Sequence, residues 1–289
     1  MGRGPYEASA AARGVFELAA QAAGTDVARL CFEGPIEELT RTDNLQVALS
    51  AVNLAHLALL QEQGLSPSAA AGHSLGEYSA LVAAGVLSAQ DALGLVALRG
   101  RLMQREALRH PGGMAAVLGL ALAAIEALCH EAGGRVVVAN HNSPEQAVIS
   151  GQIEAVARVA DLAKGAGGKA VPLAVSGAWH SPLIVGAEAE LEAAIRAVPF
   201  RAARCPVVCN VSGAAETDPE RLRANLVRQL CSPVCWVDTQ RVLAGLADLF
   251  VEVGPKRVLL GLLKKTIPGA AGVSAEDPQG LQAATERVE

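Results

Sequence analysis

The chain has 289 residues, of which 51% are hydrophobic, and its formal net charge is −5 at pH 7. This length and composition can bury a substantial core, which excludes disorder as the general state of the chain. The acidic balance and the lack of a long basic stretch argue against a nucleic-acid partner. No charge-free apolar stretch reaches the roughly 18 residues that a membrane span needs, and the first residues carry no secretory signal. We therefore expect a soluble, cytoplasmic protein.

The first part of the chain alternates helical periodicity with short apolar runs, which predicts an α/β fold. Helices are expected over residues 8–23 and 42–63, followed by an apolar run at 69–71 that leads into Gly72. From Gly113 onward the pattern changes to a βαββαβ order. Its expected elements are the run 114–120, a helix over 121–131, strands over 135–139 and 146–150, a helix over 153–165 and the run 170–175.

The βαββαβ order is that of a ferredoxin-like module. We therefore expect residues 111–175 to form a small subdomain inserted into an α/β core made of residues 1–110 and 176–289. In the second core segment, residues 176–289, strands are expected over 206–210 and 249–253 and a helix over 257–265. The Ala- and Gly-rich tail after Pro268 is expected to be a loose end.

A Gly-x-Ser-x-Gly pentapeptide, residues 72–76, stands between the short apolar run and a helix-like segment from Glu77 to Ala84. Strand, sharp turn and helix form the context of a nucleophile elbow, in which the glycines make room for a strained backbone that presents the serine. The motif predicts Ser74 as a nucleophile. The alternative is an ordinary tight turn between a strand and a helix.

A serine hydroxyl needs a base, and imidazole suits this role because its pKa lies near working pH. Three of the six histidines, at positions 56, 110 and 130, have simpler structural explanations in a helix, before a proline turn and near a helix end. Of the other three, at positions 73, 141 and 180, we single out His73 and His180 as candidates. His180 lies in a loop of small residues after an expected strand, where a side chain can reach a cleft.

Four cysteines form two Cys-x-x-x-Cys pairs, at positions 205 and 209 and at positions 231 and 235. A zinc site is one interpretation, but structural zinc sites usually use tighter spacings, and these residues lie among apolar residues typical of strands. We expect reduced, buried thiols and no metal.

Several blocks of the sequence resemble the malonyl-CoA:acyl-carrier-protein transacylases and the related acyltransferase domains of polyketide synthases. The similarity extends from Met1 to about Lys265, and the matching blocks are residues 72–81, 99–100, 139–144, 148–151, 176–183, 229–234 and 252–255. The resemblance implies an α/β-hydrolase-like core with a parallel sheet and an inserted ferredoxin-like subdomain. It also implies transfer of a malonyl group from coenzyme A to an acyl carrier protein in fatty-acid or polyketide synthesis, by a ping-pong reaction without a cofactor, and a monomeric enzyme.

The resemblance assigns roles residue by residue. Ser74 is implied as the acylated nucleophile, His180 as its base, and the backbone carbonyl of Gln229 as the group that orients His180. The backbone N–H of Leu75 is implied as an oxyanion donor, and the substrate-binding residues are implied to be Arg99, His73, Gln46 and Asn140. Arg99 corresponds to the arginine that pairs with the free malonyl carboxylate, a task that suits a guanidinium. Residues 177–180, Gly-Ala-Trp-His, correspond to the sequence variant that is associated with selection of malonyl rather than methylmalonyl substrates.

Family members usually begin with a strand and a Phe-Pro-Gly-Gln-Gly-Ser-Gln-type loop that supplies a second oxyanion donor, and Met1 aligns just after that segment. We expect the true start to lie upstream. A truncated, weakly active protein is the alternative.

Two other functions stay open. A serine esterase or thioesterase would need an acidic triad member and has no use for Arg99, whereas a non-catalytic carrier-binding subunit would not acylate Ser74. Because carrier proteins are acidic, a basic group at positions 256, 257, 264 and 265 is a candidate docking surface, or else a solvated helix face.

Overall fold

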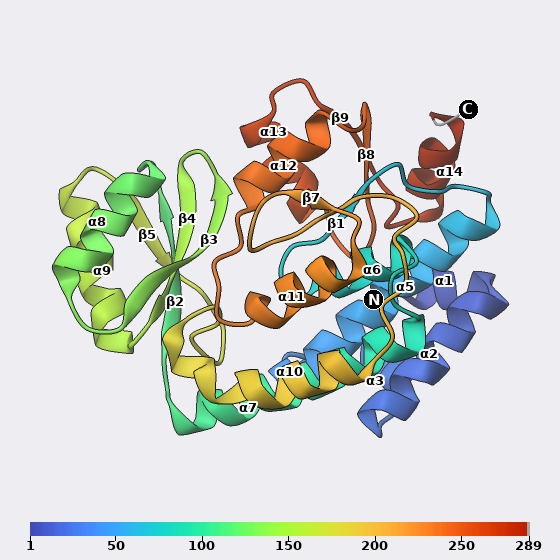
Figure 1. The fold of residues 1–289 in the computed structure, drawn as a ribbon, viewed down its shortest axis with the longest axis horizontal. Helices are drawn as coiled ribbons and strands as arrows, with labels where there is room; N and C mark the ends of the chain where they lie inside the picture. The colour runs from blue at the N-terminus through green and yellow to red at the C-terminus, as the bar shows by residue number, and fades with distance from the viewer. Residues whose placement is uncertain (288–289) are drawn as a thin grey trace.

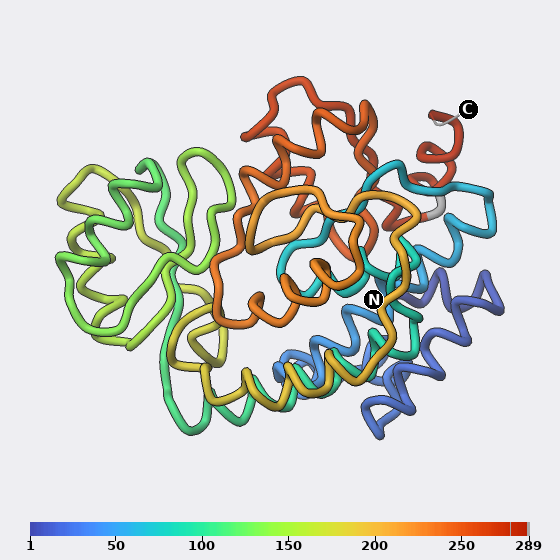
Figure 2. Tube along the Cα trace, in the orientation of Figure 1, coloured from blue at the N-terminus to red at the C-terminus, as the bar shows by residue number. Residues whose placement is uncertain are grey.

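In the computed structural model, which describes residues 1–287, a small lobe projects from a larger body (Figure 1). The helix α7 (Ala89–Arg109) runs along the body and leads directly into the first strand of the lobe, as the chain trace shows (Figure 2). The fold is a mixed α/β fold, as the sequence predicts.

Helices form the N-terminal part of the body. They are α1 (Arg3–Ala8), α2 (Ala10–Ala23), α3 (Val27–Glu33), α4 (Ile36–Leu39) and α5 (Thr42–Glu62). The expected helix over 8–23 is interrupted at Ser9, whose side chain accepts a hydrogen bond from the Ala12 N–H and so caps α2. Phe16, Val52 and Leu93 bring α2, α5 and α7 together in the main apolar core.

Short strands lie among the remaining helices of the body. Strand β1 (Ala70–Ala71) pairs in parallel with β6 (Val207–Val208), which pairs antiparallel with β7 (Ala215–Glu216). The expected strand over 206–210 is shorter than predicted, because the Cys209 N–H bonds the Ala214 carbonyl in a turn. The helices of this part are α6 (Gly76–Ala83), the 3₁₀ helix η1 (Pro182–Ala187), α10 (Glu188–Ala197), α11 (Pro219–Gln229), α12 (Trp236–Ala244) and α13 (Val258–Thr266).

The expectation of a loose C-terminal end is wrong. Strand β8 (Leu249–Glu252) pairs in parallel with β9 (Ala271–Ser274), and α14 (Pro278–Glu286) follows. Val273, Ala275 and Ala284 pack with Leu60 of α5 in a separate small core. Small apolar residues suffice here because the partner strand and α5 supply the rest of the buried surface.

The lobe has the βαββαβ order that the sequence predicts. Its elements are β2 (Gly113–Leu118), α8 (Leu122–Ala132), β3 (Val136–Ser143), β4 (Gln146–Gly151), α9 (Ile153–Gly165) and β5 (Lys169–Pro172). The strands form one antiparallel sheet in the order β3-β4-β2-β5. Alternate residues of β2 face opposite sides: Ala115 and Val117 pack under the two helices, and Met114 and Ala116 pack toward Trp179 of the body.

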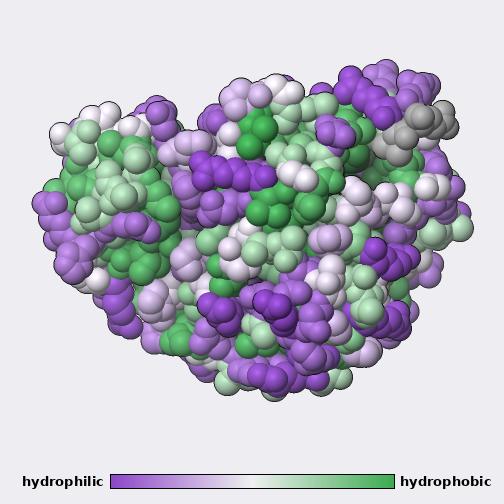
Figure 3. Space-filling model, turned by 45° about the horizontal axis from the view of Figure 1, so that its top comes forward, coloured by the Kyte–Doolittle hydropathy of each residue, from purple (hydrophilic) through white to green (hydrophobic). Residues whose placement is uncertain are grey.

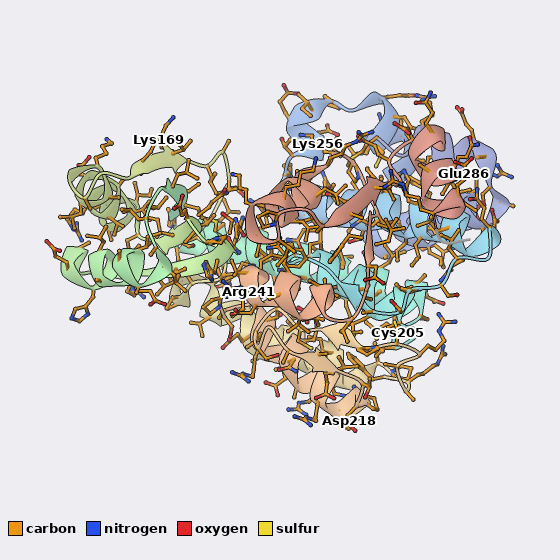
Figure 4. All side chains as sticks on the ribbon, turned by 90° about the horizontal axis from the view of Figure 1, so that it is seen from above. Lys169, Cys205, Asp218, Arg241, Lys256 and Glu286 are labelled. Atoms are coloured by element: carbon orange, nitrogen blue, oxygen red, sulfur yellow. The ribbon has the colours of Figure 1, made fainter. Side chains whose placement is uncertain are left out.

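The lobe joins the body along β3. The His141 N–H donates to the Val234 carbonyl at 2.9 Å, and the Val234 N–H donates to the Ala139 carbonyl at 2.9 Å. The surface is hollowed between the lobe and the body (Figure 3). From above, Arg241 on α12 lies near this junction, and Lys169 lies on the lobe (Figure 4).

Two further findings bear on the sequence-based expectations. No helix in the part of the chain that the structure describes is long and apolar enough to cross a membrane. The cysteines at positions 31, 129, 205, 209, 231 and 235 are free thiols.

Candidate active site

The turn between β1 and α6 has the geometry of a nucleophile elbow. Ser74 has a φ of 50°, in the left-handed region that L-residues other than glycine rarely adopt. At Gly72, an added Cβ would overlap the backbone of Gly76 and Glu77, so only glycine allows the turn to close this tightly. A strained backbone of this kind costs about 1–3 kcal/mol and persists only where surrounding contacts fix it.

Two buried amide side chains fix the strained turn. The Asn210 Oδ1 accepts the Ser74 N–H at 2.6 Å, and its Nδ2 donates to the Gly72 carbonyl at 2.8 Å. The Gln229 Nε2 donates to the Ser74 carbonyl at 2.8 Å. Both peptide groups of Ser74 are therefore held by side chains from distant parts of the chain.

His180 is in position to act as the base of Ser74. Its Nε2 lies 2.7 Å from the Ser74 Oγ, and its Nδ1 lies 3.1 Å from the Gln229 carbonyl oxygen and 3.0 Å from that of Ser232. Carbonyl oxygens only accept hydrogen bonds, so Nδ1 carries the hydrogen and Nε2 has the free lone pair. Among residues 1–287 no carboxylate contacts the His180 ring, and the site is a dyad.

The electrostatic surroundings keep His180 neutral. Burial, and then the positive charge of Arg99 and the proximity of His73, lower the pKa of His180 to about 3. The imidazole is therefore unprotonated at neutral pH and free to accept the hydroxyl proton of Ser74.

Arg99 extends from α7 to the nucleophile and is only 2% exposed. Its Nη1 donates to the Gln46 Oε1 at 2.6 Å, and its Nη2 donates to the Ser74 Oγ at 3.1 Å and to the Gln229 Oε1 at 3.4 Å. Its Nε has no partner within the described chain. A guanidinium stays cationic even where burial lowers its pKa, so the site presents a positive charge beside the nucleophile.

His73 lies where the body meets the lobe. Its Nε2 is 2.8 Å from the Oδ1 of Asn142 on β3, and its ring is edge-on to Trp236 with a centroid separation of 5.2 Å. Burial lowers the pKa of His73, so this ring too is neutral. Asn140, which the resemblance implies, is buried two residues earlier on β3. In the described part of the protein its side chain forms no hydrogen bond, and Asn142 is the asparagine that holds His73.

The Leu75 backbone N–H lies at the start of α6. It has no hydrogen-bond acceptor among the described residues, in contrast to the neighbouring N–H of Gly76, which donates to the His73 carbonyl at 2.9 Å. Free N–H groups at a helix N-terminus favour negative charge. The N–H next to the nucleophile is thus available to an oxyanion.

Glu77 is a buried acid that the sequence reasoning did not single out. It is 1% exposed, and its Oε2 accepts from the Gln229 Nε2 at 2.6 Å, while its Oε1 accepts from the Asn210 N–H at 3.4 Å. Burial raises the pKa of Glu77 to about 7, against the hydrogen bonds from these two residues and the nearby charge of Arg99.

The structure thus brings most of the residues expected from the sequence into one cluster, comprising Ser74, His180, Arg99, Gln46, Gln229, Leu75 and His73. The sequence reasoning missed Glu77, Asn210 and Asn142. Glu77 follows the motif by one residue, and an acid directly after a nucleophile turn was an available signal. Asn210 and Asn142 lie far along the chain, and no local pattern marks them.

Comparison with known proteins gives a consistent result. Residues 1–282 match the family model described as "Acyl transferase domain". The chain is 39% identical to a malonyl CoA-acyl carrier protein transacylase of Bacillus subtilis over 99% of this chain and 92% of the relative. It is 42% identical to the Escherichia coli protein of the same description, over 94% of this chain and 89% of that relative. Among solved structures, a malonyl-transacylase in complex with a type II polyketide synthase acyl-carrier protein superposes with a TM-score of 0.94 at 39% identity, over 99% of this chain and 94% of that one.

Proposed function

This chain belongs to the acyl transferase domain family, and we propose that it is an S-malonyltransferase that moves a malonyl group from coenzyme A to an acyl carrier protein. The single observation that supports this best is the contact of Arg99 with the nucleophile. A buried guanidinium donates to the same Ser74 hydroxyl that faces His180, so a substrate acylating Ser74 would place an acidic acyl group beside a fixed cation.

In the first half-reaction, His180 Nε2 takes the proton of the Ser74 hydroxyl while Oγ attacks the thioester carbonyl of malonyl-CoA. The oxyanion receives a hydrogen bond from the Leu75 N–H. When the tetrahedral intermediate collapses, the proton on His180 passes to the sulfur, and coenzyme A leaves as its thiol. The malonyl group remains as an ester on Ser74.

The second half-reaction reverses these steps with another thiol. The phosphopantetheine thiol of the carrier protein enters where coenzyme A left, gives its proton to His180, and attacks the ester. Ser74 then recovers its hydrogen from His180, and malonyl leaves on the carrier. The two carbonyls at the His180 Nδ1 support the imidazolium that forms in each half without a change of tautomer.

Selection of malonyl rests on Arg99. Its two terminal nitrogens match the spacing of a carboxylate, and Gln46 holds one of them in place. His73 and Asn140 border the same region in this proposal, and the Gly-Ala-Trp-His sequence at 177–180 restricts the space beside the malonyl methylene. At Gly177 an added Cβ would come within 2.6 Å of the Trp179 ring, so this loop is closely packed.

We extend the proposal to the partner and to the fold type. The exposed cations at positions 256, 257, 264 and 265 are candidates for docking the acidic carrier, and the Lys265 Nζ also donates to the Gln146 Oε1 of the lobe at 3.3 Å. The parallel pairs β1-β6 and β8-β9 suit an α/β-hydrolase-like core. The antiparallel order β3-β4-β2-β5 suits a ferredoxin-like subdomain between core segments 1–110 and 176–289.

A serine esterase or thioesterase is the competing function, but two observations disfavour it. His180 is oriented by carbonyls rather than by a carboxylate, and hydrolysis of a neutral ester gives no role to a buried Arg99. The intact hydrogen bond between Ser74 and His180 likewise disfavours a non-catalytic carrier-binding subunit.

The proposal is tested by the intact mass of the protein after brief incubation with malonyl-CoA, with Ser74→Ala as the matched control. We expect a gain of one malonyl group that requires Ser74. Addition of holo acyl carrier protein should then move that mass to the carrier. Release of free malonate without a carrier would favour the hydrolase, and no mass gain would favour the non-catalytic subunit.

A further inference from the structure

An acidic side chain, Glu77, and a basic side chain, Arg99, are buried beneath the nucleophile without direct contact. Glu77 is 1% exposed and Arg99 is 2% exposed. Gln229 lies between them: its Nε2 donates to the Glu77 Oε2 at 2.6 Å, and its Oε1 accepts from the Arg99 Nη2 at 3.4 Å. When Glu77 is ionised, this three-residue chain contains one negative and one positive charge, which balance.

Five further ionisable side chains near Glu77, Gln229 and Arg99 are neutral at pH 7. Burial raises the pKa of Tyr78 to about 12 and that of Cys209 to about 12, and it also raises the pKa of Cys231 beside the guanidinium. Burial lowers the pKa values of His73 and of His180. Glu188 acts on Cys231 and Glu216 acts on Cys209, but neither acts on Glu77 or Arg99. Within the described chain, the charge of the site is therefore set by the Glu77 carboxyl and the Arg99 guanidinium.

The proposed function brings a third charge into this site, because the free carboxylate of the malonyl group is an anion that pairs with Arg99. One cation would then face two buried anions, and an uncompensated buried charge is strongly unfavourable. The substrate carboxylate cannot give up its charge without losing its pairing with Arg99. The carboxyl that can be neutralised is that of Glu77.

We propose, on the basis of the proposed function, that Glu77 is the charge-compensating residue of the site and takes up one proton from solvent when the malonyl carboxylate binds at Arg99. The Oε1 of Glu77 is the acceptor of this proton, because its contact with the Asn210 N–H, at 3.4 Å, is the longer of its two hydrogen bonds. The proton comes from bulk water or buffer, and no bond of the substrate is involved.

The direction of the pH dependence follows from the same groups. The pKa of Glu77 is about 7 in the free protein, where Arg99 lowers it; an arriving anion offsets that effect and raises the pKa further. At pH 6 Glu77 is already largely protonated, so malonyl binding is accompanied by little proton uptake. At pH 8 it is largely ionised, and uptake approaches one proton. Above pH 7, affinity for malonyl should therefore fall by up to about tenfold per pH unit.

The test is calorimetric titration of the Ser74→Ala protein, which binds without turnover, in two buffers of different ionisation enthalpy. Malonyl-CoA is compared with acetyl-CoA, which lacks only the carboxylate and so accounts for protons exchanged by the coenzyme A part. We expect uptake near one proton per malonyl-CoA at pH 8, clearly less at pH 6, and none specific to acetyl-CoA. Binding of malonyl-CoA at pH 8 with no more uptake than acetyl-CoA would overturn the proposal.

Substitution of Glu77 tests whether this residue is the one that takes up the proton. Introducing Glu77→Gln into the Ser74→Ala protein should abolish the uptake, whereas Glu131→Gln, at an exposed carboxyl on α8, should preserve it. Uptake that persists with Glu77→Gln would overturn the assignment. If that variant does not fold, the pH dependence of malonyl-CoA affinity in Ser74→Ala decides instead: a flat dependence between pH 7 and 8 would refute the proposal. The mass gain on Ser74 in the unaltered protein is a separate readout, so failure of the malonyltransferase function itself would be seen there.

Discussion

The small lobe is stabilised by apolar side chains that lie within residues 113–172, whereas the nucleophile turn is fixed by polar side chains from distant parts of the chain. Ile125, Ile149 and Val159 are fully buried in the lobe and are brought together by regular strands and helices. Ser74 is held instead by Asn210 and Gln229, which are 136 and 155 residues away in the sequence. The lobe therefore depends on volume and packing, and the turn depends on individual hydrogen bonds.

Loss of the base should have the largest effect on activity. With His180→Ala, nothing accepts the proton of Ser74, and we expect the rate of malonyl loading to fall by about 10⁴-fold or more. Rapid-quench measurement of the loading rate by intact mass tests this. A fall of less than about tenfold would show that another group acts as the base.

The next largest effect is expected at Arg99. Arg99→Ala removes the two charge-assisted hydrogen bonds that we propose to the malonyl carboxylate. Each should contribute about 1.5–3 kcal/mol, so kcat/KM for malonyl-CoA should fall by about 10²- to 10⁴-fold. Activity with acetyl-CoA, which has no carboxylate, is the internal control and should fall far less. Equal losses with both substrates would mean that Arg99 acts on Ser74 rather than on the acyl group.

The sequence predicted the lobe more fully than the site, and the reason is physical. Periodicity and turn residues define each element of the lobe locally, and its helix over 153–165 was predicted with the observed bounds. In the site, the Gly-x-Ser-x-Gly motif singled out Ser74, whereas the local sequence left both His73 and His180 as candidate bases and only the resemblance chose His180. Asn210 was missed because its role exists only once β6 lies beside β1, and a hydrogen bond across the fold leaves no periodic signal.

The C-terminal segment illustrates the same limit. Residues 271–286 have a small-residue composition that indicated a loose end, yet β9 pairs with β8, and the side chain of Asp277 caps α14 by accepting the Gly280 N–H at 2.7 Å. The Asp-Pro pair at the start of α14 was a readable helix signal. The pairing of β9 with β8 could not be predicted in the same way, since it depends on a strand about twenty residues earlier.

A smaller effect is expected from the asparagine that clamps the turn. Asn210→Ala leaves the Ser74 N–H and the Gly72 carbonyl without their partners, and each unpaired group should cost about 1–3 kcal/mol of unfolding free energy. Because the strained Ser74 backbone loses its support, we also expect loading to slow by about 10- to 100-fold. Denaturant unfolding and the loading rate, measured on the same samples, test both parts. Unchanged loading by a destabilised variant would show that the clamp serves stability alone.

The smallest effect on activity, and the sharpest contrast with Asn210, is expected in the core of the lobe. Ile149 is fully buried in β4, so Ile149→Ala should cost about 2–5 kcal/mol of stability through lost packing and the cavity left behind. Its side chain lies in the core beneath α8 and α9, on the opposite face of the sheet from Trp179, so the loading rate per folded molecule should change by less than about twofold. The folded fraction from denaturant unfolding provides the normalisation. If Ile149→Ala slowed loading as much as Asn210→Ala at equal folded fraction, lobe packing would itself help to position Asn142 and His73, and the separation between the two regions would fail.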